Sequence, residues 1–468
     1  MPTGALLCRL PEKISVMKPR YFYLIGISIC AILTCVLNAC QRNSPSDTPE
    51  RLVSASVTQK WYRLTLELEQ HTPGYRPPVS ARTFAYIALA AYNAAQPCMP
   101  EMAAASSFLK GSPPVSLPDK NVPLLLPAVL NAAYATIIKR TFATAPVPLL
   151  TRIDETENEL HTFIENQFPQ NYNSSAAFGA SAANAVWNWS QTDTLGHDAC
   201  MFNYDRNFVP NDCPGCWKPS TGNSKPALLP HWGEVRTFMI VPDEFSIKPP
   251  VPFDEKPGSA FYTEAMEVFT TSQHLSKENH WIAEFWSDDL PEFTVSPSGR
   301  WVSITWQAIE KARPEFSKII EIYLKTGIAL HDAGVLCWKE KYKYQLERPD
   351  TYIQRNISPG WEPLHPSPNF PAYPSGHAAC GAAAATVLSD LLGADFAMTD
   401  RTHEGRTEFQ GQPRSFASFE DMAHENALSR LALGVHFRMD CEEGLRLGRL
   451  AGHKINAVSL RKRETIRQ

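Results

Sequence analysis

The sequence predicts an all-α protein of two packed helical bundles, with a long proline-rich loop segment between them. Apolar residues recur at helical spacing in many segments, such as 80–96 and 123–142. Strand-like alternation is scarce. Between about Asp198 and Gly258 the periodicity breaks and prolines recur. Such a segment is typical of a loop that covers a site, and Trp217 and Trp232 would then pack over a cavity. An ordered crossover between two helical halves is the alternative.

The N-terminus carries an export pattern. In Met17–Cys40, Lys18 and Arg20 precede an apolar run that ends in the motif LNAC. The pattern resembles a bacterial lipoprotein signal peptide, which implies cleavage before Cys40 and attachment of lipid to it. A single transmembrane anchor is the alternative. Both place the remaining chain outside the cytoplasm, and the first makes it a periplasmic or cell-surface lipoprotein of a bacterium.

These observations divide the chain into four parts. Residues 1–40 form the signal peptide, with an over-long start before Met17, and residues 41–52 form a linker. Residues 53–258 form an N-terminal helical region with covering loops, and residues 259–468 form a C-terminal bundle that carries the site. The formal net charge of −4 gives no support to a general affinity for nucleic acid. Contact with a membrane is expected only through the lipid anchor, and the sequence carries no signal for an oligomeric state.

Cysteines of the proline-rich segment suggest a disulfide. Cys213 and Cys216 have CxxC spacing, and Cys200 lies upstream. A disulfide that staples the loop is favoured over redox chemistry, because an exported protein can form disulfides. No second pair stands at zinc-finger spacing.

The first segment with chemical character is KYKYQLERP. Lys341 and Arg348 are seven residues apart, which is two turns of a helix. On one continuous helix both would project from the same face, and Pro349 would end that helix. Two such cations favour an anion between them, and a solvated basic face is the alternative.

The second segment is Pro374-Ser375-Gly376-His377, which precedes an alanine-rich helix. The first amides of a helix attract anions, and Gly376 lets the backbone approach a ligand closely. Ser375 is expected to act as N-cap or as ligand donor, and His377 can move protons near neutral pH. An ordinary N-cap with an incidental histidine is the alternative.

The third segment is SRLALGVHFRMD. Arg430 and His436 are six residues apart and would lie on different faces of one helix. Gly434 is a predicted helix stop, so His436 is expected in the turn beyond, directed toward the same point as Arg430. A buried histidine and an unrelated arginine are the alternative.

Together the three segments supply three cations, a hydroxyl, a glycine amide and two histidines. They contain no acidic or thiolate ligand set, so they are not suited to bind a divalent cation. The predicted guest is a tetrahedral or trigonal-bipyramidal oxyanion whose oxygens the cations and amides stabilise. One histidine can bond the central atom while the other handles protons.

The three blocks K-x6-R-P, P-S-G-H and S-R-x5-H occur in this order. They resemble the signature of the superfamily that joins type 2 phosphatidic acid phosphatases, bacterial class A acid phosphatases and vanadium-dependent haloperoxidases. The segments FPAYPSGHA, ENALSRLALGVHFRMD and IAEFWSDD look like the chloroperoxidase group of the haloperoxidases.

This resemblance implies an enzyme that binds vanadate and uses hydrogen peroxide to oxidise halide to a hypohalous species, which halogenates a small organic acceptor. It implies that His436 is the axial ligand to vanadium and that His377 is the acid–base residue. It assigns the vanadate oxygens to Lys341, Arg348, Ser375, Gly376 and Arg430. Phe370 would flank the halide site, and Asp289 would orient Arg430.

The alternative function is a phosphomonoesterase that uses the same pocket. His436 would then attack phosphorus and His377 would protonate the leaving group, so phosphate would be the substrate group rather than a competitor of vanadate. A third hypothesis is a non-catalytic surface lipoprotein that binds oxyanions. The two histidines disfavour it, because binding alone does not require them.

Overall fold

Helices predominate in the part of the chain that the structure describes, and strands occur there only as two small antiparallel pairs. The structure is a computed structural model that describes residues 48–115, 123–219, 225–288, 290, 293–407 and 410–462. The predicted all-α class is confirmed. The predicted signal peptide, including Cys40, lies outside the described residues. Within them, no helix is long and apolar enough to cross a membrane.

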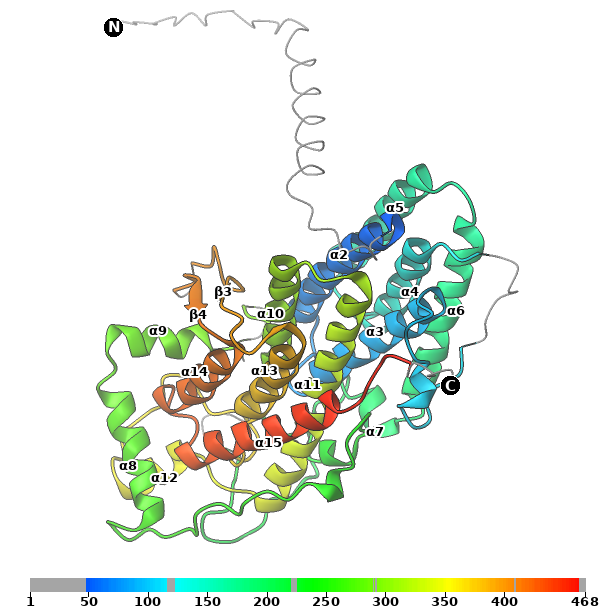
Figure 1. The fold of residues 1–468 in the computed structure, drawn as a ribbon. Coiled ribbons are helices and arrows are strands. Elements are labelled where there is room, and N and C mark those ends of the chain that lie inside the picture. The colour runs from blue at the N-terminus through cyan, green and yellow to red at the C-terminus, as the bar shows by residue number, and fades with distance from the viewer. Residues whose placement is uncertain are drawn as a thin grey trace, which may run out of the picture. The chain divides into compact units, whose positions relative to one another are not determined.

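The first half of the described chain is a set of helices that pack side by side (Figure 1). Thr48 caps the first of them and Pro49 occupies its first turn, so this helix starts inside the predicted 41–52 linker. The helices are α2 (Pro49–His71), α3 (Val79–Ala95), α4 (Leu126–Thr141), α5 (Val147–Gln167), α6 (Tyr172–Gln191) and the short α7 (Thr194–His197).

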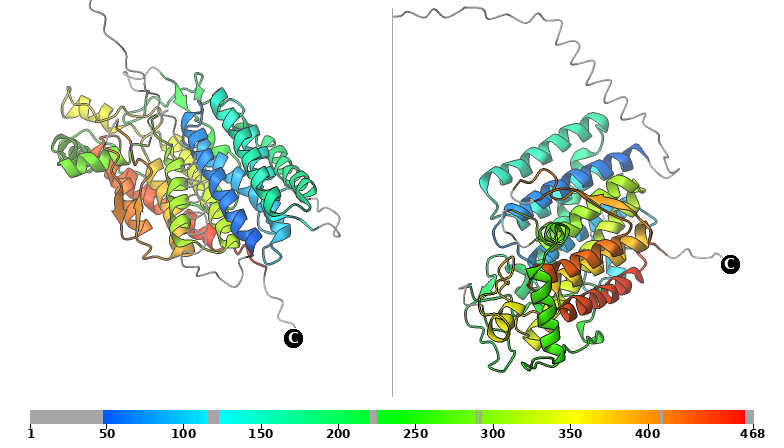
Figure 2. Two further views of the ribbon diagram at one scale, coloured as in Figure 1. Left: turned by 90° about the horizontal axis from the view of Figure 1, so that it is seen from above. Right: turned by 90° about the vertical axis from the view of Figure 1, so that its left-hand side faces the viewer.

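The second half carries the longest helix, α11, which packs against α3 on one side and against α13 on the other. Figure 2 shows the helices of the two halves side by side, with α2 to α6 in blue to cyan and α13 to α15 in orange to red. The helices are α8 (Ala260–Gln273), α9 (Lys277–Phe285), α10 (Pro297–Ala312), α11 (Phe316–Tyr344), α12 (Pro349–Asn356), α13 (Gly376–Leu392), α14 (Phe419–Ala432) and α15 (Arg438–Asn456). Strands β3 (Met398–Asp400) and β4 (Arg414–Phe416) pair between α13 and α14.

Small residues let the central helices approach closely. A Cβ atom at Gly327 of α11 would lie 3.1 Å from the Cα of Ala85 in α3. On α15, Gly444 and Gly448 face backbone carbonyls of α13, where an added Cβ would lie within 2.6 Å and 2.2 Å of them. One continuous apolar core therefore runs through both halves, from Val57 to Leu460.

The described parts of the proline-rich segment, residues 198–219 and 225–258, contact α11. Three of its backbone amides, at Phe238, Met239 and Ile240, donate to the carboxylate of Asp332 in α11. Trp217 and Trp232 are buried and contact side chains of α11. Strands β1 (Tyr204–Asp205) and β2 (Ala227–Leu228) pair within the segment.

The predicted loop disulfide is present between Cys213 and Cys216, whereas Cys200 is a free thiol. The loop pairs with the chain that follows α11, because Cys216 and Leu346 form an antiparallel bridge. The amide of Glu347 also donates to the carbonyl of Gly215. The disulfide loop is thus anchored to the segment that joins Lys341 to Arg348.

The prediction that Lys341 and Arg348 share one helix is wrong. Helix α11 ends at Tyr344 because Gln345 adopts a left-handed conformation, with φ of 45°. Arg348 is the N-cap residue of α12, and Pro349 begins this helix instead of ending one. Proline suits the first position of a helix, where an amide proton would have no intrahelical partner.

Candidate active site

Residues from the three predicted segments meet at one small pocket, which we call the anion pocket. It is lined by Gly376, His377, Arg430, His436, Phe370 and Trp338, together with Cys380 and four prolines. Lys341 and Arg348 border it, since their cationic groups lie 5.1 Å and 4.8 Å from the centre of the Phe370 ring. Three segments far apart in the sequence therefore converge, as the sequence predicted.

Lys341 is completely buried in the last turn of α11. Its Nζ donates to the carbonyls of Pro371 and Ala372, at 2.8 Å and 2.9 Å. Burial, together with the positive charge of Arg348, lowers the pKa of Lys341 to about 7. An anion beside the amine would favour its charged form, so the amine is suited to bind one.

Arg348 is held at the start of α12 by carbonyl oxygens of two other segments. Its Nε donates to the carbonyl of Phe370 at 2.9 Å, and its Nη1 donates to the carbonyl of Val435 at 2.8 Å. The same Nη1 lies 3.2 Å from Nε2 of His436. The guanidinium therefore links the loop before α13 to the turn after α14.

Helix α13 points its N-terminus at the anion pocket. Ser375 is its N-cap, and the Ser375 hydroxyl accepts from the amide of Ala378 at 3.4 Å. A Cβ atom at Gly376 would lie 3.3 Å from the Trp338 ring and 4.0 Å from Cε of Lys341. Glycine thus keeps free the space between the helix amides and the lysine. His377 follows in the first turn and lines the pocket.

His436 lies in the turn between α14 and α15, beyond Gly434, as predicted. Gly434 has a φ of 82°, which favours glycine. Nδ1 of His436 lies 2.9 Å from Oδ2 of Asp440, which also accepts from the amide of Phe437. A carboxylate accepts and a guanidinium donates, so Nδ1 carries the proton and Nε2 presents a lone pair.

The charge state of His436 agrees with this tautomer. Burial and the nearby cations Arg348, Lys341 and Arg430 hold the pKa of His436 well below its usual range. The imidazole is therefore neutral at neutral pH. A neutral imidazole with a lone pair on Nε2 can bond the central atom of an oxyanion.

Arg430 belongs to the last turn of α14, and its Nη1 donates to the carbonyl of Trp286 at 3.3 Å. The turn that follows α9 therefore contacts the arginine from behind. Asp289, predicted to orient Arg430, lies outside the described residues. Its neighbour Asp288 is described, and it lines the cavity next to Arg430.

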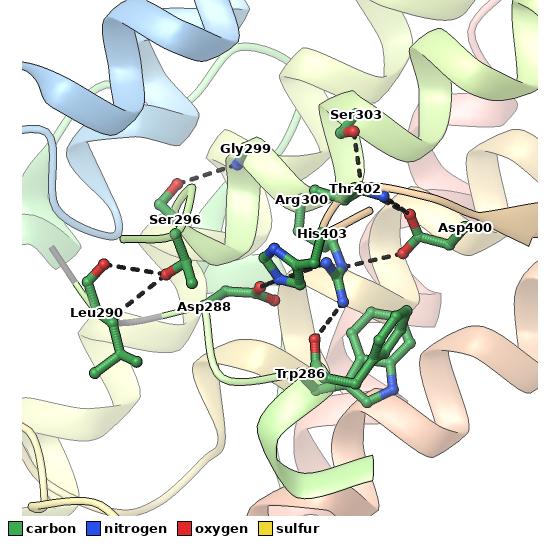
Figure 3. Close-up of polar contacts among 12 residues, drawn as sticks. Trp286, Asp288, Leu290, Ser296, Gly299, Arg300, Ser303, Asp400, Thr402 and His403 are labelled. Carbon is green, nitrogen blue, oxygen red and sulfur yellow. Dashed lines mark hydrogen bonds and ion pairs between the residues drawn. The ribbon is translucent and has the colours of Figure 1, made fainter. Parts of the chain in front are cut away.

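Arg300 of α10 holds this same turn and is the centre of a second buried cluster (Figure 3). Its Nε lies 3.1 Å from Oδ2 of Asp400, and its Nη1 lies 3.8 Å from Oδ1 of Asp288. It also donates to the carbonyl of Phe285, and it stacks over the Trp286 ring. We call Arg300, Asp288, Asp400 and His403 the Arg300 cluster, since Nε2 of His403 is 3.2 Å from Asp288.

A larger cavity adjoins the anion pocket. This outer cavity has a volume of about 550 Å³ and shares Pro77, Pro368, Phe370 and Arg430 with the anion pocket. Its walls come from the loop after α2, from strands β1 and β2 and from the loop before α13. It is therefore a route by which small molecules can reach the pocket.

Three residues of the site were missed by sequence reasoning. Trp338 lines the anion pocket one helical turn before Lys341, and only that spacing could have indicated it. Asp440 had a local signal, since it stands four residues after His436 in the first turn of α15. Arg300 had none, because its partners are distant in the sequence.

The donor set fits an oxyanion such as vanadate. Buried cations, a helix N-terminus and a neutral imidazole surround the anion pocket. Oxygen atoms of an anion would receive hydrogen bonds from the first two, and the imidazole lone pair would meet its central atom. Among the described residues, no three His, Cys, Asp or Glu side chains are grouped so as to hold a metal cation.

Comparison with known proteins gives a consistent result. Residues 321–464 match the model of the VCPO second helical-bundle domain. Vanadium chloroperoxidase from Curvularia inaequalis is 26% identical over an alignment of 167 residues, which covers 25% of this chain. The match spans 27% of that curated relative.

Solved structures are similar over most of the chain. The structure described as the first bacterial vanadium-dependent iodoperoxidase has a TM-score of 0.78 and 27% identity, covering 88% of this chain and 98% of its own. A holo-type bacterial vanadium-dependent chloroperoxidase has a TM-score of 0.58 and 16% identity, covering 89% of this chain and 94% of its own, which shows the shared fold. With the converging pocket and the matched second bundle, these likenesses support a vanadium haloperoxidase, to which the chain is similar in fold and in its second helical bundle.

Proposed function

We propose that this protein is a vanadate-dependent haloperoxidase that uses hydrogen peroxide to oxidise halide to a hypohalous species. The observation that carries the proposal is the lone pair of the neutral His436, which faces buried cations at the mouth of α13. Lys341, Arg348, Arg430 and the amide of Gly376 would hold the vanadate oxygens, and Nε2 of His436 would bind vanadium. Ser375 remains a proposed ligand beside its role as N-cap. When bound, vanadate supplies a Lewis acid that polarises hydrogen peroxide.

The side chains around the pocket have separate tasks. Asp440 keeps the proton on Nδ1 of His436, so Nε2 keeps the lone pair that would bind vanadium in place of its contact with Arg348. The ring of His377 lines the same pocket and is the group that accepts and returns the proton of peroxide. Its backbone is fixed, since its carbonyl accepts from Nδ2 of Asn426 at 3.2 Å.

The apolar wall limits the access of water to the pocket. Trp338 and Phe370 pack together with ring centres 5.0 Å apart, and both line the anion pocket. Charges and dipoles act more strongly where water is excluded. Phe370 lies between the anion pocket and the outer cavity, which is the position proposed for a halide. Iodide is the first halide to test, because one similar structure is described as an iodoperoxidase.

The test begins with purified protein that has been stripped of anions and then reloaded with orthovanadate. Oxidation of iodide and of bromide is followed with hydrogen peroxide present, and hydrolysis of a phosphate monoester is followed without vanadate. The proposal expects halide oxidation that requires both vanadate and peroxide. Ester hydrolysis without any halide oxidation would assign the site to a phosphatase instead.

Export is part of the proposal but depends on the sequence alone. Lipid attached to Cys40 would tether the protein at the periplasmic or outer face of the cell. The mass of the mature N-terminus from membrane fractions tests this, since a Cys40→Ser variant should be released without lipid. Recovery of the same unprocessed mass for both proteins would exclude lipidation.

A further inference from the structure

The outer cavity carries positive charge that the halide chemistry of the anion pocket does not explain. Arg76, which is half-buried, and Lys225, which is exposed, both line it. Neither cation forms an ion pair with a carboxylate among the residues that the structure describes. Cations that line a cavity attract anions and orient them.

Arg76 projects from an ordered loop. The loop follows α2, and Gly74 within it has a φ of 93° and packs against the carbonyl of Cys200. The carbonyl of Gly74 accepts from the amide of Arg76 at 2.9 Å and from Nδ2 of Asn203 at 3.0 Å. The next residue, Pro77, lines both the outer cavity and the anion pocket. Arg76 is therefore one residue away from the passage between the two.

Lys225 belongs to a second segment of the cavity wall, just before β2. Its Nζ lies 5.7 Å from the centre of the Tyr204 ring, which also lines the cavity. Strand β2 is fixed to the loop before α13, since the amide of Leu228 donates to the carbonyl of Asn369. The wall that carries Lys225 is thus tied to the loop that carries Phe370.

The carboxyl groups in the cavity wall do not cancel these charges. Asp288 is turned toward Arg300 and His403. Glu69 is buried and accepts from the amide of Ser296, and burial raises its pKa to about 7. Arg76 lies near enough to lower the pKa of Glu69, but the two form no ion pair. Among the described residues that line the cavity, the cations Arg76, Lys225 and Arg430 outnumber the carboxyl groups Glu69 and Asp288.

The two cavities meet at Phe370, Pro77, Pro368 and the cation Arg430, so three of the four shared residues are apolar. Leu228, Leu433 and Val435 add apolar surface to the outer cavity. Cavities of a few hundred Å³ with such walls and a few polar groups take small organic molecules. A planar ring can lie against the proline and phenylalanine surfaces while a charged group reaches Arg76.

We propose that the outer cavity binds the organic acceptor, and that this acceptor is an electron-rich aromatic carboxylate whose carboxylate pairs with Arg76 and Lys225. The proposal rests on the proposed haloperoxidase function and deepens it. The ring lies next to Phe370 and Arg430, where the oxidised halogen leaves the anion pocket. Halogenation then occurs on a bound acceptor rather than on whatever the released species meets in solution.

The reaction balances with peroxide and halide as the reagents of the proposed function. Halide, hydrogen peroxide and one proton give hypohalous acid and water, so the halide loses two electrons to peroxide. The ring carbon then attacks the halogen, a carbon–halogen bond forms and the halogen–oxygen bond breaks. The ring proton combines with the departing hydroxide to give a second water.

Direct binding tests the site without turnover. The probes are 3-fluoro-4-hydroxyphenylacetate and its neutral amide, titrated by fluorine NMR with vanadate present to fill the anion pocket. The carboxylate should bind about fivefold or more tightly than the amide, as expected for a partly exposed ion pair. The double variant Arg76→Gln/Lys225→Gln should lose that preference. Equal affinities in the unaltered protein, or a preference that the variant keeps, would overturn the proposal.

Turnover gives a second, internally normalised measurement. Equal amounts of 4-hydroxyphenylacetate and 4-hydroxyphenylacetamide compete for bromination, and the product ratio is compared with that from reagent hypobromite. Their ring reactivities are similar because a methylene separates the charge from the ring. A bound acceptor gives an excess of the carboxylate product, which falls to the reagent ratio in the double variant. The reagent ratio from the unaltered enzyme would contradict directed halogenation.

A matched control removes the same charge elsewhere. Lys110 and Lys277 are exposed and lie outside the cavity. The variant Lys110→Gln/Lys277→Gln should keep both the binding preference and the product ratio, and a loss in this control would assign the effect to net charge alone. The two arms also separate the hypotheses. Carboxylate binding without halide oxidation would leave the acceptor site standing and refute the haloperoxidase function.

Discussion

Arg300 and Arg348 are both almost completely buried, but the groups that accept their hydrogen bonds differ. Arg300 faces two carboxylates, those of Asp400 and Asp288, and a backbone carbonyl. Arg348 donates to the carbonyls of Phe370 and Val435, and Lys341 beside it also donates to two carbonyls. Carbonyl oxygens fix the direction of a cation without cancelling its charge.

This difference separates a structural cluster from a binding pocket. The positive charge of Arg300 is compensated by two carboxylates of the protein, so the role of the Arg300 cluster is to hold the turn that contacts Arg430. The anion pocket gathers Lys341, Arg348 and Arg430 in a buried place, where positive charge is costly unless an anion is near. We interpret that cost as the basis of oxyanion binding.

The largest effect, on the free energy of unfolding, is expected when one cation is removed from the Arg300 cluster and, in a separate variant, one from the anion pocket. Arg300→Met leaves Asp288 and Asp400 buried without their cation, which should lower the free energy of unfolding by about 3–5 kcal/mol. Lys341→Met loses two hydrogen bonds but also removes a desolvated charge, so at pH 6 it should cost less than about 1.5 kcal/mol. Urea denaturation of the anion-free proteins measures both. Equal losses would mean that the two regions do not differ as described.

The two histidines should divide their effects between binding and turnover. His436→Ala removes the proposed bond to vanadium and should weaken vanadate binding about 100-fold, or about 2.7 kcal/mol. His377→Ala should keep vanadate affinity within about threefold and abolish peroxide turnover. Equilibrium dialysis followed by an iodide oxidation assay separates the two. A matched loss of affinity in both variants contradicts the assigned roles.

The pKa of Lys341 predicts how affinity for an anion depends on pH. Burial lowers this pKa to about 7, and a bound anion would raise it. Below that pH the amine is already charged, so binding takes up no proton. Above it binding must add a proton, and affinity should fall by up to about tenfold per pH unit. Sulfate is a suitable probe because its own charge is constant in this range.

Calorimetry of sulfate binding between pH 6 and 9 measures this slope. Lys341→Met is the control, since it should bind sulfate weakly at every pH and show a much flatter profile. An affinity that is constant or rises with pH in the unaltered protein would remove Lys341 from the anion site.

The disulfide should have the smallest effect. The Cys213–Cys216 loop is anchored to the segment that joins Lys341 to Arg348. Its reduction opens only a short loop, so the free energy of unfolding should change little. Vanadate binding should weaken about threefold, because one support of that segment loosens. A Cys213→Ser/Cys216→Ser variant should show the same weakening and no response to reductant, and unchanged binding would exclude this support.

Much of the site could be predicted because its residues carry local signals. Ser375 and Gly376 mark the start of α13, and Gly434 with its positive φ marks the end of α14. Both signals depend on the backbone preferences of single residues. The same preferences failed at Gln345, which ends α11 in a left-handed conformation that glutamine rarely adopts.

Other features depend on partners that are distant in the sequence. Arg300 lies in α10, and Asp400 follows α13. Nothing in either neighbourhood indicates that they form an ion pair. Arg76 and Lys225 likewise come from two loops that only the folded chain brings to one cavity. Helix boundaries and blocks of motif residues are local properties, whereas the balance of buried charge is a property of the whole fold.

Direct titration of the anion-free protein with orthovanadate tests the central claim, that the buried cations of the anion pocket bind one oxyanion. Calorimetry should show one vanadate per chain, displaced by phosphate and lost in Lys341→Met/Arg348→Met while the Arg300 cluster remains intact. Absence of binding in the unaltered protein, or equal binding in that double variant, would contradict the account.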